Sequence, residues 1–300
     1  MSQVSSKTIK KVNQECRELV RDRPLLASII DLWKELVFPK DGDLCLSGIA
    51  DQKIMEFLSE SLEVISIEKL LQSMVGDYLT FGRFAATLTK DVTRGRWAHC
   101  VLWDSDYYGI KVRPNSEEPE LVVYASQEAQ DWATSSDPNI IWQRECMDPE
   151  LLKTLQDGEV TLPQDQTIFM ARRGHSTDFY GTSWLRSAAD TSDGVASALL
   201  AGGIHVAALR RKGPFYLFYE GPAKHLRDQI TNYVVKEKIL KPLVEWHQYP
   251  MPTVEWLKGH SPEAVRRQIV QLVESTGITL DVLESRQQQI MKEHGSIASI

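Results

Sequence analysis

The sequence feature that most constrains the fold is a turn followed by a long run of small residues, from 180 to 212, which reads YGTSWLRSAADTSDGVASALLAGGIHVAALRRK. The run predicts one helix from Thr182 or Ser183 to about Arg211, roughly 43 Å long at 1.5 Å per residue. Its many Ala, Ser and Gly residues let neighbouring helices approach closely but bury little apolar surface. Such a helix is suited to packing beside copies of itself.

A second placement for this helix stays open, namely the interior of one large globular domain. That placement requires a stronger apolar face than the segment SAADTSDGVASALLAGG provides. Packing between copies instead uses the small residues Ala198, Ala201, Gly202 and Gly203 as contact points. The two adjacent glycines are also where a bend in the helix costs least.

Composition excludes several classes of protein. The 300 residues carry a net charge of −7, which argues against tight wrapping of nucleic acid, because neutralising phosphates requires clustered Lys and Arg. The four cysteines are far apart in the sequence and predict reduced thiols rather than a disulfide framework or a zinc knuckle. No apolar run resembles a signal peptide or a membrane span, so we expect a soluble, cytoplasmic product.

Local patterns predict a mixed α+β fold in which helices predominate. Strands are expected in a small antiparallel meander over residues 83–113 and at residues 167–174 and 214–222. Residues 114–139 mix an acidic loop with a possible helix. Helices are expected over residues 5–37 with a break at Pro24, 51–63, 66–82, 223–240 and 280–295, with further starts at Asp148-Pro149 and Ser261-Pro262.

Candidate catalytic motifs are weak. The segments GHSTD and GTSWL begin like a nucleophile elbow but lack its second glycine, and no glycine-rich loop ends in Gly-Lys-Ser/Thr. The seven histidines form no metal-binding pair at helical spacing. Acidic loop residues such as Asp104, Asp106 and Asp178 leave a metal-dependent nucleic-acid-processing enzyme as an alternative, and a non-viral helical scaffold or adaptor as another.

Two segments resemble the portal proteins of tailed bacteriophages, which form the ring at the unique capsid vertex. One is VGDYLTFGRFAATLTKD, at 75–91, similar to a helix that leads into a strand in the portal wing. The other, LPQDQTIFMARRG followed by DFYGTSWLRSAAD, at 162–190, is similar to the family's short strand and Tyr-Gly-x-Ser-x-Leu turn that open a long helix. The later segment KGPFYLFYEGP also fits, because portals commonly carry a strand there.

The resemblance implies an α+β portal fold with wing, stem and clip regions. It implies an N-terminal wing part at 1–123, stem and clip at 124–181, the long stem helix at 182–212, and a wing return with a partial crown at 213–300. Tyr180, Gly181 and Ser183 then form the clip-to-stem turn. Family subunits are usually longer than the 300 residues of this chain, so the chain is expected to be a compact variant, a fragment or a processed form.

The resemblance also implies the partners. They are eleven further copies in a ring of twelve, the terminase large subunit, the major capsid protein, head-completion or adaptor and tail proteins, and double-stranded DNA passing through the channel. It implies a virion location after assembly in the host cytoplasm, with no membrane, cofactor, metal or catalytic residue. Arg210, Arg211 and Lys212 would form a ring of positive charge near the tunnel; alternatively, they complement the helix dipole at its C-terminal end.

Overall fold

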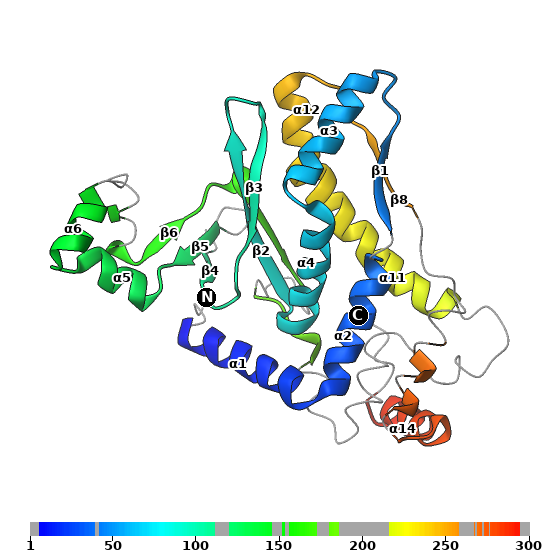
Figure 1. Ribbon diagram of the computed structural model, residues 1–300. Helices are drawn as coiled ribbons and strands as arrows, with labels where there is room; N and C mark the ends of the chain where they lie inside the picture. Colours follow the sequence, from blue (N-terminus) through cyan, green and yellow to red (C-terminus); the bar gives the residue numbers. More distant parts are fainter. Residues whose placement is uncertain are drawn as a thin grey trace.

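The computed structural model is a mixed α+β protein (Figure 1). Small antiparallel sheets lie among a larger number of helices, as the sequence predicts. The predicted boundaries of wing, stem, clip and crown stay predictions. The structure describes residues 6–39, 42–111, 120–145, 152–153, 156–172, 180–185, 216–257, 267, 269–271, 273–275 and 277–294.

Four helices in the first 81 residues follow their local start and stop signals. Pro24 opens α2 directly after α1 ends, and the Asp51 side chain caps α3 by accepting a hydrogen bond from the backbone N–H of Lys53 at 2.9 Å. Helix α4 ends at Gly82, whose φ of 76° is readily adopted by glycine. These predictions are confirmed, with bounds α1 Ser6–Asp22, α2 Pro24–Val37, α3 Gln52–Val64 and α4 Ile67–Phe81.

The chain leaves α4 directly into the central strand of a three-stranded antiparallel sheet. Strand β2 (Arg83–Asp91) pairs on one side with β3 (Arg96–Leu102) and on the other with β7 (Thr167–Ala171). The short helix η1 (Gln164–Gln166) leads into β7. The predicted strand in residues 167–174 is therefore confirmed, and it lies beside the strand that follows α4.

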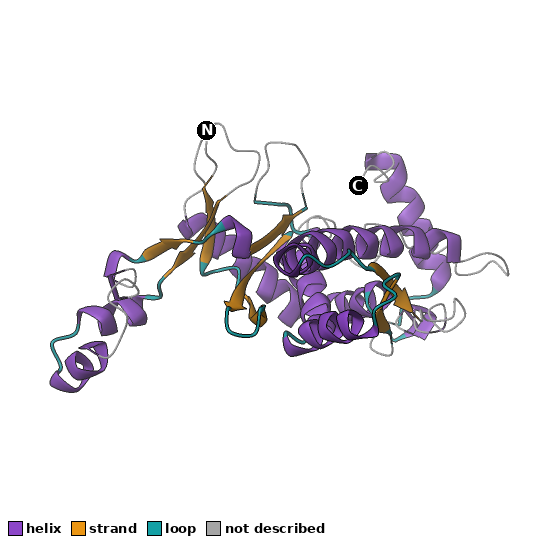
Figure 2. Cartoon of the chain, turned by 90° about the horizontal axis from the view of Figure 1, so that it is seen from above, coloured by secondary structure: helices purple, strands orange, loops and turns teal. Residues whose placement is uncertain are grey.

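A second sheet and two helices form an arm that projects away from the helical body (Figure 2). The predicted meander is wrong at its third strand: β4 leaves the β2–β3 hairpin and pairs with β5 instead. The intervening turn is held on α1 by hydrogen bonds to Asp106, which redirects the chain. The arm contains β4 Tyr108–Lys111, β5 Glu120–Tyr124, β6 Glu159–Thr161, α5 Gln127–Thr134 and α6 Pro138–Glu145.

The predicted strand over 214–222 is also wrong, because residues 216–222 are helical. A continuous helical run begins there: α11 (Tyr216–Ile230), the π-helical segment η2 (Thr231–Leu240) and α12 (Lys241–His247). Aromatic residues favour a strand only weakly. The buried side chains of η2 and α12 stabilise the helical run, and the helix extends back into residues 216–222. The helix predicted at 223–240 is thus part of a longer one.

A two-stranded ribbon joins distant parts of the chain. Strand β1 (Asp43–Ser47) pairs antiparallel with β8 (Thr253–Leu257), and sequence patterns indicated neither strand. The C-terminal helix α14 (Leu280–His294) is confirmed. The helix starts predicted at Asp148-Pro149 and Ser261-Pro262 lie outside the described residues.

One large apolar core joins α2, α3, α4, the β2 sheet and the η2–α12 run. A smaller cluster of Ala85, Tyr108 and Leu121 connects the sheet of the body to the arm. Among the described residues, none of the helices has the length and apolar character needed to cross a lipid bilayer.

Candidate functional site

The turn predicted at Tyr180, Gly181 and Ser183 is seated where α4 becomes β2. The Arg172 N–H donates to the Gly82 carbonyl at 2.7 Å, and the Thr182 N–H donates to the Arg172 carbonyl at 2.9 Å. Gly82 and Gly181 both have positive φ, 76° and 73°, and a Cβ on either would overlap the backbone of the other segment. Both positions therefore require glycine for conformation and for space.

Ser183 begins a helical turn and attaches it to the body. Its hydroxyl donates to the Thr80 carbonyl at 2.5 Å and accepts from the Leu185 N–H at 3.2 Å, the pattern of a serine at a helix start. Trp184 and Leu185, the first two helical residues, are 2% and 0% exposed and lie in the main core. The first two residues of the predicted helix are therefore anchored to the body of the protein.

The remainder of that predicted helix lies outside the described residues. This holds for the predicted packing positions and for the predicted cation cluster, so their roles stay predictions. The residues concerned are Ala198, Ala201, Gly202, Gly203, Arg210, Arg211 and Lys212.

Arg83 connects this turn to helix α1 and to the arm. Its guanidinium, in a residue only 4% exposed, donates to the Tyr180 carbonyl at 3.1 Å and to Asn13 Oδ1 at 3.0 Å. It also lies over the ring of Tyr108, 5.8 Å from the centroid. The Tyr180 hydroxyl in turn donates to the Ile110 carbonyl on β4 at 3.2 Å. Helix α1, the arm sheet and the 180–185 turn therefore share one hydrogen-bonded network.

Asp104 and Asp106, the acidic pair considered for metal binding, belong to the same network. Arg17 contacts Asp104 at 2.6 Å and Asp106 at 2.5 Å, and Asn13 donates to Asp106 at 2.7 Å. Burial lowers the pKa of Arg17, but the hydrogen bonds and charges of the two carboxylates outweigh burial and raise it. Arg17 thus pairs with both carboxylates and offsets one of their two negative charges. No cluster of three potential metal ligands occurs in the part of the chain that the structure describes, and Asp178 lies outside that part.

Sequence reasoning missed Asp77, which lies on α4 beside this network. Burial first, and then the negative charge of Asp104, raise the pKa of its carboxyl, to about 7 once all contributions are included. Arg17, Lys34 and Arg83 act in the opposite direction. The sequence offered one signal of this burial, because Asp77 lies in the apolar stretch SMVGDYLTF. A carboxyl in such a stretch loses contact with water when another element packs over it.

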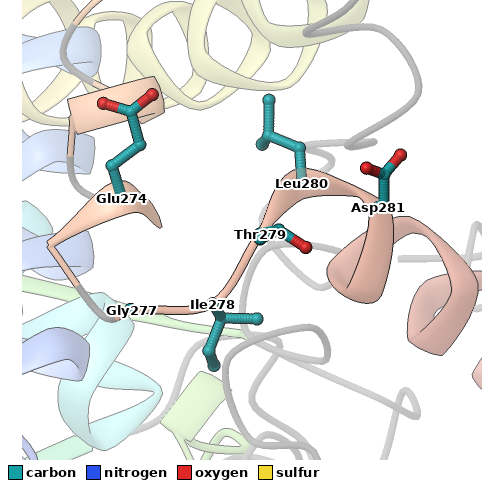
Figure 3. A pocket seen from close by; sticks show the side chains of 6 residues that line it. All are labelled: Glu274, Gly277, Ile278, Thr279, Leu280 and Asp281. Carbon is teal, nitrogen blue, oxygen red and sulfur yellow. The ribbon is translucent and has the colours of Figure 1, made fainter.

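A shallow hollow beside the start of α14 offers a different kind of surface (Figure 3). Glu274 and Asp281 lie at its two ends, and Leu280 lies between them in this view, so the carboxylates do not converge on one point. An acid–base pair requires both groups within reach of one reacting atom. The hollow therefore does not suggest a catalytic site.

The network at the turn connects segments that are distant in the sequence. Arg17 is bonded to the two aspartates, and Arg83 is bonded to the neutral Asn13 side chain and to the Tyr180 carbonyl. Such an arrangement holds these segments in a fixed relation. No protein-family model matches the chain, and none of the curated proteins is detectably similar to it.

Proposed function

We propose that this chain is the portal subunit of a tailed bacteriophage. Copies of it form a ring of twelve, the number that the resemblance implies, at one capsid vertex, and double-stranded DNA passes through the central channel during packaging and ejection. The subunit is structural, and the motor chemistry belongs to the terminase that docks on the ring. The major capsid protein and the head-completion or adaptor and tail proteins are its other partners, and the virion is its final location after assembly in the host cytoplasm.

The observation that carries the proposal is the seating of the 180–185 turn. The turn that the portal resemblance assigns to the entry of the stem helix is bonded to Gly82, Thr80 and Arg83, and Trp184 and Leu185 after it are helical. A long channel helix transmits load from DNA to the shell, so it requires a firm attachment to the wing.

Two further features support the proposal. The arm carrying α5 and α6 stands away from the helical body, as a clip region that meets the packaging motor would require (Figure 2). The net charge of −7 suits a channel through which DNA slides, because each additional cation would add salt-dependent affinity for phosphates.

Native mass spectrometry of the purified full chain tests the proposal. The expected spectrum contains one dominant closed assembly whose mass is a fixed multiple of 34.1 kDa, with twelve copies as the expected multiple. A chain that stays monomeric from micromolar to hundred-micromolar concentration would rule out the portal assignment. An open ladder of sizes would do so as well, because a ring closes at one number.

A further inference from the structure

The arm is joined to the body at a short turn between β3 and β4, residues 104–107, here called the arm root. Its two acids are bonded to helix α1, because Arg17 contacts Asp104 at 2.6 Å and Asp106 at 2.5 Å. The arm itself projects away from the body (Figure 2). Its orientation therefore depends on the ion pairs at the arm root.

Asp77 lies on the side of α4 that faces these ion pairs. Asp77 and Phe81 are four residues apart in the helix and therefore share one face. The guanidinium of Arg17 lies over the ring of Phe81, 5.2 Å from its centroid, while it bonds the arm root. The titratable and charged groups that act on Asp77 come from α1, α2, β2 and the start of the arm. They are Arg17, Lys34, Arg83, Asp104 and Tyr108.

The charges of this cluster balance only while Asp77 is protonated. The cluster then holds two positive and two negative charges, which belong to Arg17, Arg83, Asp104 and Asp106. The remaining cation, Lys34, is paired with Asp31 at 3.0 Å. Ionisation of Asp77 adds a third carboxylate away from bulk water and beside a like charge. The pKa of Asp77, raised to about 7 by burial and then by Asp104, reflects this cost.

The arm root also contains a group that favours its release. Ser105 is only 1% exposed, and its hydroxyl makes no hydrogen bond to any residue that the structure describes. Its carbonyl accepts from the Asn13 side chain at 3.0 Å, which keeps the turn against α1. A buried hydroxyl without a partner is costly, and water would satisfy it once the turn lifts from α1. The attachment is therefore opposed from within the turn.

We propose that ionisation of Asp77 releases the arm root from α1, so that the arm is held in acidic solution and reorients in neutral and alkaline solution. The carboxylate of Asp77 repels Asp104 and competes with it for Arg17. Release removes Asp104 and admits water, which lowers the pKa of Asp77, so the released arrangement binds fewer protons. Its population therefore grows as pH rises from about 4 to 7. The device belongs to a single chain and does not depend on the portal assignment.

Hydrogen exchange of the full chain, measured by mass spectrometry at pH 5 and pH 8, tests this device. The comparison is between the unsubstituted chain and Asp77→Asn, which carries a neutral side chain at every pH. The reporting amides are those of Asp106 and Tyr107, which donate to Asp104 within the arm root. We expect equal exchange at pH 5. At pH 8 these amides should exchange at least about tenfold faster in the unsubstituted chain than in Asp77→Asn.

Two controls separate local release from a general loss of stability. Asp131→Asn removes an exposed carboxyl on α5 and should exchange like the unsubstituted chain at both pH values. Amides of the ribbon formed by β1 and β8, which is distant in the fold, should exchange equally in all three chains (Figure 1). Equal exchange of the arm root at pH 8 in the unsubstituted chain and Asp77→Asn would overturn the proposal. A matching acceleration in the ribbon would overturn it as well, because the whole chain would then be opening.

Discussion

Gly82 and Gly181 lie backbone against backbone, although they are far apart in the sequence. Gly82 ends the helix that leads into β2, and Gly181 lies in the turn that leads into the helix starting at Trp184. The close approach of these two glycines joins the junction of α4 and β2 to the turn that precedes Trp184.

Replacing Gly181 by Ala should destabilise the junction. The substitution costs about 1 kcal/mol for the positive φ, and overlap with the Gly82 carbonyl adds more, so we expect a loss of about 2 kcal/mol or more in the free energy of unfolding. Gly277→Ala is the matched control, since Gly277 has φ of 71° but nothing within 4 Å of the added Cβ. Urea unfolding of both variants checks this, and equal losses would contradict it.

Replacing Arg83 by Met should cost about 2 to 4 kcal/mol of stability. The substitution leaves the Tyr180 carbonyl and Asn13 Oδ1 without their charged donor in a buried setting. Arg21→Met, on an exposed side chain of α1, should change stability by less than about 0.5 kcal/mol. Chemical denaturation measures both, and a nearly neutral Arg83→Met would show that the network does not hold the turn.

Asp77 should make the protein less stable as pH rises from about 4 to 7. Its folded pKa, about 7, lies above the ordinary value of 3.8, so in this range the folded state binds more protons than the unfolded state. The contribution of Asp77 to the free energy of unfolding then falls with a slope of up to about 1.4 kcal/mol per pH unit. Asp77→Asn should remove this component.

The measurement is urea unfolding at several pH values between 4 and 8. Asp131→Asn, which alters an exposed carboxyl on the arm, controls for the loss of one negative charge. Identical pH profiles for the unsubstituted chain and Asp77→Asn would refute the role given to Asp77.

Divalent metal should not stabilise the protein through Asp104 and Asp106. Arg17 is bonded to both carboxylates and offsets one of their two charges, so adding Mg²⁺ or Mn²⁺, or removing metal with EDTA, should shift the thermal midpoint by less than about 1 °C. Arg17→Gln releases the pair and serves as the comparison. A large stabilisation of the unsubstituted chain by metal, with nuclease activity, would favour the metal-dependent enzyme instead.

The parts of the fold that sequence predicts are those with local causes. Pro24 separates α1 from α2, Asp51 caps α3 and Gly82 ends α4, and each signal lies within a few residues of its effect. The clip-to-stem role of Tyr180, Gly181 and Ser183 stays a prediction, but the positive φ of Gly181 is likewise a local feature. Such features depend little on the rest of the chain.

The parts that sequence missed depend on distant partners. Asp43 pairs with Leu257, and neither segment has a pattern strong enough to indicate a strand without the other. The helical residues 216–222 were predicted as a strand because their aromatic content outweighed the helix that follows them. The acidic character of Asp77 was visible, but its burial follows from packing at the junction of α4 with its neighbours.

Electron cryo-microscopy of the purified full chain tests the central claim most directly. We predict closed rings with a central hole, in which the helix that starts at Trp184 lines the channel and the 180–185 turn is seated at Gly82. Isolated single copies, or rings in which that helix lies on the outer surface, would contradict the assignment.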